Sequence, residues 1–142
     1  MKKIITLCLL GTSLLTVSAQ NDVSKTWVSD LGNGTYKNPV LYADYSDPDI
    51  CRVGDDYYMT ASSFNCLPGL PILHSKDLVN WTKHPRVLHI EDVPWVKYAL
   101  WAPSIIQANG KYYLFFGGND IQNNEQYGGI GVAVSDKPEG PF

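Results

Sequence analysis

Asp47 is the residue whose surroundings point most directly to chemistry. It lies in the stretch Tyr45-Ser46-Asp47-Pro48-Asp49-Ile50-Cys51, where two carboxylates flank a proline just before an apolar run. Proline restricts the residue before it to extended backbone, so we expect Asp47 to be held in extended geometry at the entrance of a strand. A carboxylate held in this way could act as a base. It could also be a turn residue, and this stretch alone favours the turn because Asp and Pro are common turn formers.

Other motifs for catalysis or for binding metals and phosphate are weak or absent in this sequence. The three histidines, His74, His84 and His89, do not share the spacing of a metal site. The sequence has no nucleophile elbow of a Ser/His/Asp triad and no glycine-rich phosphate loop. We interpret Gly128-Gly129-Ile130-Gly131 as the start of a hairpin. The prediction for metals and cofactors in this chain is therefore none.

The segment 1–19 has the features of a cleaved signal peptide. Lys2 and Lys3 form a basic start, and residues 4–17 are mostly apolar but too short to span a bilayer. Val17-Ser18-Ala19 supplies small residues before a predicted cut after Ala19. We therefore predict a secreted or periplasmic protein without a membrane attachment after cleavage. Export permits a disulfide between Cys51 and Cys66, although two free thiols are at least as compatible with the sequence.

The predicted mature chain is acidic and rich in aromatic residues. The 11 Lys and Arg residues, less Lys2 and Lys3, leave 9 basic against 14 acidic side chains. This balance disfavours nucleic acid or an anionic membrane as a partner, because both require clustered positive charge. Aromatic residues make up 12% of the chain, and nine are tyrosines. An exported, acidic chain with many Tyr and Trp residues fits the handling of carbohydrate.

Short strands separated by turns are predicted from about residue 49 onward, after an irregular lead-in over 20–37. Aromatic and β-branched runs surround a Gly/Asp turn, which is the pattern of a hairpin. The predicted strands cover 50–53, 57–62, 72–75 and 81–88, with a loop over 64–71. No stretch has a sustained 3.6-residue period, so helices should be minor.

The pattern then repeats. Pro103-Ser104-Ile105-Ile106 matches Pro48-Asp49-Ile50-Cys51 at an offset of 55 positions, as Tyr112-Tyr113-Leu114 matches Tyr57-Tyr58-Met59. Residues 131–136 match 71–76 at an offset of 60 positions. A repeat of about 50 residues made of up-and-down strands is typical of a β-propeller blade. Two unrelated hairpins with similar turns are the alternative.

We therefore predict an all-β chain in which 38–142 form the first part of a propeller. Blade one covers about 46–88, and blade two covers about 101–142. Two blades cannot close a propeller, which typically needs four or more. The chain should then be incomplete, with a flat apolar flank exposed.

Blade geometry places Asp47 at a rim. Because strands alternate in direction, Asp47, the loop over 62–69, Trp101 and a loop over 117–128 should share one end. Phe64 and Trp101 could supply apolar walls for a sugar ring, or they could pack between blades. The counterpart of Asp47 in the second repeat is Ala102. A turn former would be expected to recur, so a carboxylate in one blade alone favours a special role.

A carboxylate at such a rim suits glycoside hydrolysis, which needs one ionised and one protonated carboxyl group. Asp47 in a solvated channel would stay ionised and serve as the base. No convincing acid is found in the chain. Asp120 lies in the predicted loop over 119–126, and Glu91-Asp92 lies in the linker between blades.

Several motifs together resemble glycoside hydrolase family 43, over about residues 36–142. They are Asn38-Pro39-Val40, the run from Ser46 to Tyr58, Ser62-Ser63-Phe64, the run from His74 to Trp81, and Trp101-Ala102-Pro103. The resemblance implies a five-bladed β-propeller of which this chain covers about the first two blades. It also implies an inverting enzyme that removes xylose or arabinose from plant-wall polysaccharides such as xylan, mostly at chain ends or side branches.

The resemblance further implies roles for individual residues. Asp47 matches the general base, and Phe64 and Trp101 match aromatics that line the sugar subsite. The general acid Glu and an Asp that tunes it would lie beyond Phe142, so the 142-residue chain should be inactive alone. Any ion near the channel floor would also come from the missing blades.

Two positions depart from the wording common in β-xylosidases of this family, and rival functions remain. Asp49 stands where Ser is frequent after Asp-Pro, and Ser104 stands where His is frequent after Trp-Ala-Pro. Xylosidase and arabinofuranosidase activity are therefore both open. The alternatives are a sugar-binding propeller without catalysis and a retaining, fructan-cleaving propeller.

Overall fold

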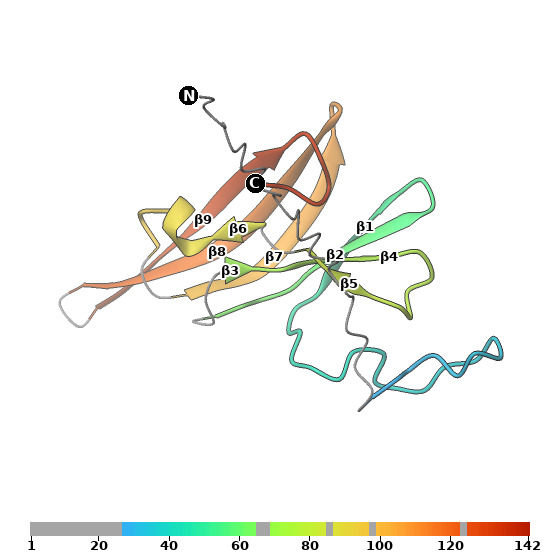
Figure 1. The fold of residues 1–142 in the computed structure, drawn as a ribbon. Helices are drawn as coiled ribbons and strands as arrows, with labels where there is room; N and C mark the ends of the chain where they lie inside the picture. The colour runs from blue at the N-terminus through green and yellow to red at the C-terminus, as the bar shows by residue number, and fades with distance from the viewer. Residues whose placement is uncertain (1–26, 65–68, 85–86, 97–98, 123–124) are drawn as a thin grey trace, which may run out of the picture.

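The structure, a computed structural model, describes residues 27–64, 69–84, 87–96, 99–122 and 125–142, and these form an all-β fold (Figure 1). Its elements are β1 (Asp49–Val53), β2 (Asp56–Thr60), β3 (Gly69–Leu70), β4 (Ile72–Ser75), β5 (Thr82–Lys83), β6 (Leu88–His89), the 3-10 segment η1 (Ile90–Asp92), β7 (Ala99–Ala108), β8 (Lys111–Gln122) and β9 (Glu125–Ser135). The predicted signal peptide and Cys66 lie outside the described residues.

The first sheet is an antiparallel meander with the strand order β1-β2-β4-β5. Gly54, with φ of 63°, makes the tight turn between β1 and β2, a conformation that glycine adopts without steric cost. The rungs Ile50↔Met59 and Tyr57↔Ser75 fix the register. The predicted hairpin and the predicted third strand are confirmed.

The second sheet, β7-β8-β9, repeats the register of the first sheet. Ile105 pairs with Leu114, and both residues lie 55 positions after the pair Ile50↔Met59. Tyr112 pairs with Ser135, so the third strand is displaced by 60 positions relative to Tyr57↔Ser75. The repeat spacings predicted from the sequence are therefore confirmed strand by strand.

Three predictions about the strands were wrong. The region 117–128 was predicted as a loop, but β8 and β9 continue as a ladder through Asn119↔Gly128 to Gln122↔Glu125. Residues 128–131 consequently lie inside β9 rather than at the start of a hairpin. The predicted fourth strand over 81–88 is also split, because Thr82–Lys83 pairs with β4 whereas Leu88–His89 pairs with β3.

Packing of aromatic rings explains why a glycine-rich stretch forms strands here. A Cβ at Gly117 would collide with the Trp101 indole, and a Cβ at Gly131 would collide with the Phe116 ring. At Gly118 the nearest atoms would belong to Val96 and Trp95. The glycines therefore make room for rings that cover the ladder, and this tertiary packing overrides the low strand propensity of glycine.

The hydrophobic core lies between the two sheets and holds them together. Its buried members come from both sheets, from β3 and β6, and from the linker before β7: Leu70, Ile72, Val87, Leu88, Val93, Val96, Leu100, Ile105, Leu114 and Phe116. Figure 1 shows the short β3–β6 pair beside the strands of both sheets. Burial of these side chains fixes the position of the second sheet relative to β1, which matters for the site described below.

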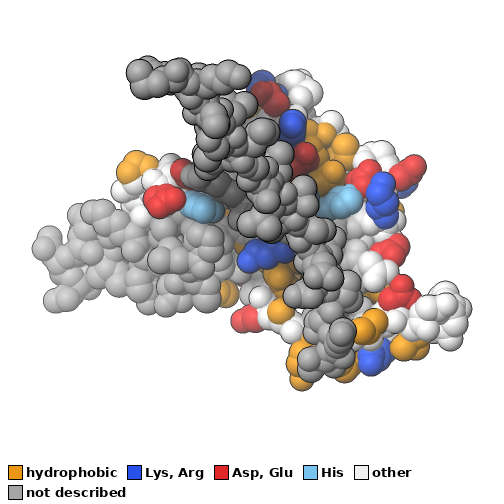
Figure 2. Space-filling model, viewed as in Figure 1, with side chains coloured by type: hydrophobic (Ala, Val, Ile, Leu, Met, Phe, Trp, Pro, Cys, Tyr) orange, Lys and Arg blue, Asp and Glu red, His pale blue; other side chains and the backbone are white. Residues whose placement is uncertain are grey.

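One face of the second sheet carries exposed apolar side chains, as predicted for the flank of an incomplete propeller. Ile106 on β7 and the β9 residues Ile130, Val132 and Val134 are all exposed, Ile130 to 83%. Figure 2 shows one face of the molecule, on which hydrophobic side chains reach the surface between charges of both signs. In the described part of the chain no helix is long and apolar enough to cross a membrane.

Cys51 packs against the core and has a free thiol. Burial, assisted by the nearby Asp49 carboxylate, raises the pKa of this thiol.

Candidate active site

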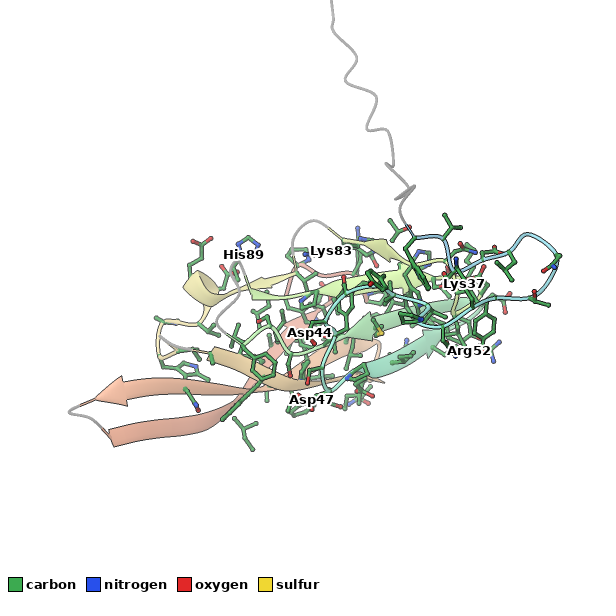
Figure 3. The ribbon with its side chains drawn as sticks, turned by 90° about the horizontal axis from the view of Figure 1, so that it is seen from below. Lys37, Asp44, Asp47, Arg52, Lys83 and His89 are labelled. Carbon is green, nitrogen blue, oxygen red and sulfur yellow. The ribbon has the colours of Figure 1, made fainter. Side chains whose placement is uncertain are left out.

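Asp47 lies two residues before β1, at the bend that leads into this strand (Figure 3). In that view Asp47 lies near the middle of the molecule, whereas Arg52 lies farther to the right, on the side away from the tip of the β8–β9 hairpin. The backbone of Asp47 has φ of 48°, which is left-handed. The predicted extended geometry was therefore wrong, because tertiary contacts override the local preference of a residue that precedes proline.

The left-handed backbone belongs to the repeat, whereas the carboxylate does not. Ala102, the counterpart of Asp47 in the second blade and also followed by a proline, has φ of 42°. The register of β7 against β8 shifts between Trp101 and Ser104, which marks a β-bulge at this point. Both blades thus have the same strained strand entrance, and only the first presents an acidic side chain there.

Ser62, just after β2, binds the segment that contains Asp47. Its backbone N–H donates to the Ser46 carbonyl at 2.9 Å, and its hydroxyl donates to Asp47 Oδ2 at 2.7 Å. The Ser46 hydroxyl donates to the same oxygen at 3.1 Å. In turn, the Ala102 N–H donates to Ser62 Oγ at 2.8 Å. A hydrogen-bonded chain therefore runs from the second blade through Ser62 to Asp47.

Asp49, the other carboxylate beside Pro48, joins the two blades. Its Oδ2 accepts hydrogen bonds from Ser104 Oγ and from the Ile105 N–H, both at 2.8 Å, and its Oδ1 accepts one from the Ile50 N–H at 3.0 Å. Ser104 and Asp49 are equivalent positions of the two repeats, so this contact ties one strand entrance to the next. Both oxygens of the Asp49 carboxylate are therefore engaged in hydrogen bonds within the fold, whereas Asp47 is exposed at the rim.

Phe64 and Trp101 lie on the two segments that Ser62 connects to Asp47, since Phe64 follows Ser62 by two residues and Trp101 precedes Ala102. Phe64 and Leu100 exchange backbone hydrogen bonds of 2.8 and 3.0 Å, which brings the end of the first hairpin against the start of β7. Trp101, the next residue, pairs with Gly117 and packs its indole over that glycine. Phe64 is 42% exposed and Trp101 is 37% exposed, so both rings present a free surface. The hydrogen bonds of Leu100 and Ser62 thus connect the segments that carry these residues, and the role of the two rings as walls of a sugar subsite stays a prediction.

The other acidic residues considered from the sequence do not join this group. Glu91 and Asp92 lie in η1, where Glu91 contacts His89 Nδ1 at 3.2 Å and Asp92 accepts the His89 N–H at 3.1 Å. The side chain of Asp120 is outside the described part of the structure. Among the described residues, no group of three His, Cys, Asp or Glu side chains could hold a metal ion.

The histidine pair of the first sheet lies at a different place, on β4 and just after β5. His74 and Lys76 both contact the Asp56 carboxylate, and these partners lower the pKa of Asp56. His84 stands close to His74, and burial lowers the pKa of His84. This cluster is a local charge network of the first blade.

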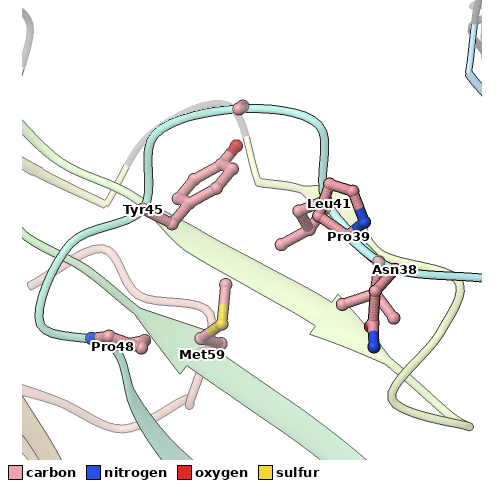
Figure 4. A pocket seen from close by; sticks show the side chains of 8 residues that line it. Asn38, Pro39, Leu41, Tyr45, Pro48 and Met59 are labelled. Carbon is pink, nitrogen blue, oxygen red and sulfur yellow. The ribbon is translucent and has the colours of Figure 1, made fainter.

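An apolar pocket of about 630 Å³ lies between the segment 38–48 and the first sheet (Figure 4). Its lining residues are Asn38, Pro39, Val40, Leu41, Ala43, Tyr45, Pro48 and Met59. Burial raises the pKa of Tyr45, so that phenol stays neutral. The pocket touches the Asp47 segment through Tyr45 and Pro48, and no carboxylate is among its lining residues, so it lacks the groups that hydrolysis requires.

Ser62 is the residue of the site that the sequence did not reveal. It was predicted to lie where the strand 57–62 meets the rim loop, and within the motif Ser62-Ser63-Phe64, but no role was assigned to it because no local pattern shows where a hydroxyl points. The repeat contains a signal: the position of Ser62 in the second blade is Gly117. The two side chains of the Asp47–Ser62 pair are thus replaced together, by Ala102 and Gly117.

Comparisons with known proteins all find glycoside hydrolases. Residues 36–142 match the sequence model of Glycosyl hydrolases family 43. The chain is similar to a beta-xylosidase of Formosa agariphila, with 38% identity over 122 residues that cover 80% of this chain and 19% of that protein. It is also similar to a non-reducing end alpha-L-arabinofuranosidase of Bacteroides ovatus, with 33% identity over 127 residues, 82% of this chain and 23% of that protein.

A solved structure shares the fold. The crystal structure of a GH43 protein from Bacillus licheniformis superimposes with a TM-score of 0.62 at 34% identity, over 75% of this chain and 23% of that one. The two sheets with their repeated register are accordingly two neighbouring blades of a propeller. The chain spans about a fifth of the length of the curated relatives it matches.

Proposed function

This chain belongs to glycosyl hydrolase family 43, and from that premise we propose that the whole protein is an exported, inverting glycosidase. Its substrates would be xylose or arabinose residues of plant-wall polysaccharides or oligosaccharides. Two relatives that carry the names beta-xylosidase and alpha-L-arabinofuranosidase support this pair of sugars. The basic start and apolar run of residues 1–19 support export.

The observation that carries the proposal is the asymmetric setting of the Asp47 carboxylate. Among the described residues, the hydrogen bonds that reach this carboxylate, from Ser46 and Ser62, both end on Oδ2. Oδ1 is thereby left to accept a proton from a water molecule. A base at an exposed rim beside two aromatic rings is the arrangement that an inverting glycosidase needs on one side of the sugar.

In the proposed reaction Asp47 Oδ1 takes a proton from water as the water oxygen forms a bond to the anomeric carbon. The bond from that carbon to the leaving oxygen breaks on the opposite face of the ring. A carboxylic acid protonates the leaving oxygen, and we place this acid on a part of the whole protein beyond Phe142. Room for water between base and sugar is what distinguishes inversion from retention.

The experiment that tests the proposal follows the configuration of the first product. The whole protein should hydrolyse nitrophenyl β-xyloside or nitrophenyl α-arabinofuranoside, and proton NMR of the early reaction should show the anomer of opposite configuration. Comparing the rates on the two nitrophenyl glycosides would identify the sugar. Retention would contradict the base role of Asp47 and favour a nucleophile, whereas sugar binding without turnover would favour the non-catalytic alternative.

Trp101 is proposed to form an apolar wall of the sugar subsite. Replacing Trp101 by Ala should lower kcat/KM of the whole protein by about 10- to 100-fold, because burying an aromatic surface contributes about 1.5–3 kcal/mol. Trp27→Ala is the matched control, since the Trp27 indole stacks on Tyr42 and donates to the Pro39 carbonyl, and it is not among the residues predicted to line the sugar subsite. Steady-state kinetics should show near-normal kcat/KM for the control. Equal values for both variants would remove Trp101 from the substrate site.

A further inference from the structure

We propose that Ser62 is a positioning residue that couples the second blade to Asp47 and fixes which carboxylate oxygen acts on water. The inference rests on the proposed function, because it assumes that Asp47 is the base. It concerns a hydroxyl that touches the base and not the substrate.

The hydrogen-bonding capacity of a serine hydroxyl gives Ser62 one orientation. A hydroxyl has a single proton to donate and two lone pairs to accept with. Ser62 Oγ accepts the Ala102 N–H at 2.8 Å, so its proton is directed away from that donor. The proton meets Asp47 Oδ2 at 2.7 Å, within the ordinary range of an O–H···O hydrogen bond. The second blade thereby sets the direction in which Ser62 donates.

Burial makes this orientation persistent. Ser62 is only 7% exposed, so its hydroxyl has little access to competing water. The backbone bond from the Ser62 N–H to the Ser46 carbonyl, 2.9 Å long, holds the same segment at a second point. Two attachments at neighbouring residues resist rotation of the carboxylate. They also help to hold Asp47 in its left-handed backbone, which is unfavourable for a residue other than glycine unless its surroundings enforce it.

Comparison of the two blades shows that the bend needs neither a carboxylate nor a hydroxyl at these two positions of its own blade. The second blade has the same bend with Ala102 in place of Asp47 and Gly117 in place of Ser62. The bend therefore forms without a hydroxyl at the second position. The Trp101 indole lies over Gly117, where a side chain would otherwise stand. Carboxylate and hydroxyl occur together in one blade and are lost together in the other, which is expected if one serves the other.

The test uses the whole protein and compares Ser62→Ala with wild type in steady-state kinetics. The expected result is a fall in kcat of about 10- to 100-fold with little change in KM, because a hydrogen bond to a charged group is lost. Ser62→Thr, which restores the hydroxyl, should recover most of kcat. Ser63→Ala is the matched control, since the Ser63 hydroxyl is directed at the Leu100 carbonyl, at 3.5 Å.

A double-variant cycle distinguishes positioning from a general structural effect. In an Asp47→Asn background, Ser62→Ala should cause no further loss of kcat, whereas a purely structural serine would lower the residual rate again. Wild-type kcat in Ser62→Ala, or an additive loss in the cycle, would overturn the inference. If Ser62→Ala melts below the assay temperature, Ser62→Cys keeps the volume with a weaker donor and should show the same fall in kcat. Wild-type kcat in that variant would overturn the inference as well.

The same experiments separate this inference from the proposed function. Near-normal activity of Asp47→Asn would reject the base itself. An inactive Asp47→Asn together with a fully active Ser62→Ala would reject only the positioning role.

Discussion

Asp47→Asn in the whole protein is expected to lower kcat by about 10²- to 10⁴-fold, the range that general acid–base catalysis contributes. The amide cannot take a proton from water, although it keeps the size of the carboxylate. Asn tolerates the left-handed backbone that Asp47 adopts, so the fold should be retained. Activity on a nitrophenyl glycoside, together with a melting curve, measures both effects.

The matched control for this variant is Asp55→Asn. Asp55 lies in the turn after β1 and is exposed, with its carboxylate 3.5 Å from Arg52. Surface ion pairs of this kind contribute little to stability, so its kcat and melting temperature should be close to wild type. An Asp47→Asn variant that is as active as the Asp55→Asn control would show that Asp47 is not the base.

The second large effect is a loss of activity, which we expect when only residues 1–142 are present. Residues 1–142 alone should show no turnover of nitrophenyl xyloside or arabinofuranoside, whereas the whole protein should be active. Among the described residues, Asp47 is the carboxylate at the rim beside the two aromatic rings, and glycoside hydrolysis requires a second, protonated carboxyl group. Without that group the leaving oxygen is not protonated, and the base has no partner.

Inactivity of the short chain needs a control for folding, because its second sheet exposes an apolar face. Far-ultraviolet circular dichroism should show β-structure, and size-exclusion chromatography should show whether the chain associates. A folded, inactive short chain agrees with the proposal. Measurable turnover by a short chain free of the whole enzyme would contradict it and would place the acid within residues 1–142.

The apolar and turn patterns of the sequence determined the strands and their repetition. Aromatic and β-branched runs around the Gly/Asp turn are short-range signals, so they predicted the first hairpin correctly, and the repetition of the runs predicted the second. The two repeat offsets followed from the same signals and agree with the observed registers. Short-range signals did not predict that β8 and β9 continue as a ladder through residues 117–128. The glycines there leave space for aromatic rings, and the packing of these rings favours strands.

The sequence also singled out Asp47, Phe64 and Trp101, because strand direction alone places them at one rim. Only the tertiary structure decided how Asp47 is held. Its left-handed backbone runs against the preference of a residue before proline, and its partner Ser62 lies 15 residues away in the chain. The Ala102 N–H that orients Ser62 is 40 residues further along. Such contacts depend on how two sheets pack over a shared core, and that packing is set by many distant side chains together rather than by any local pattern.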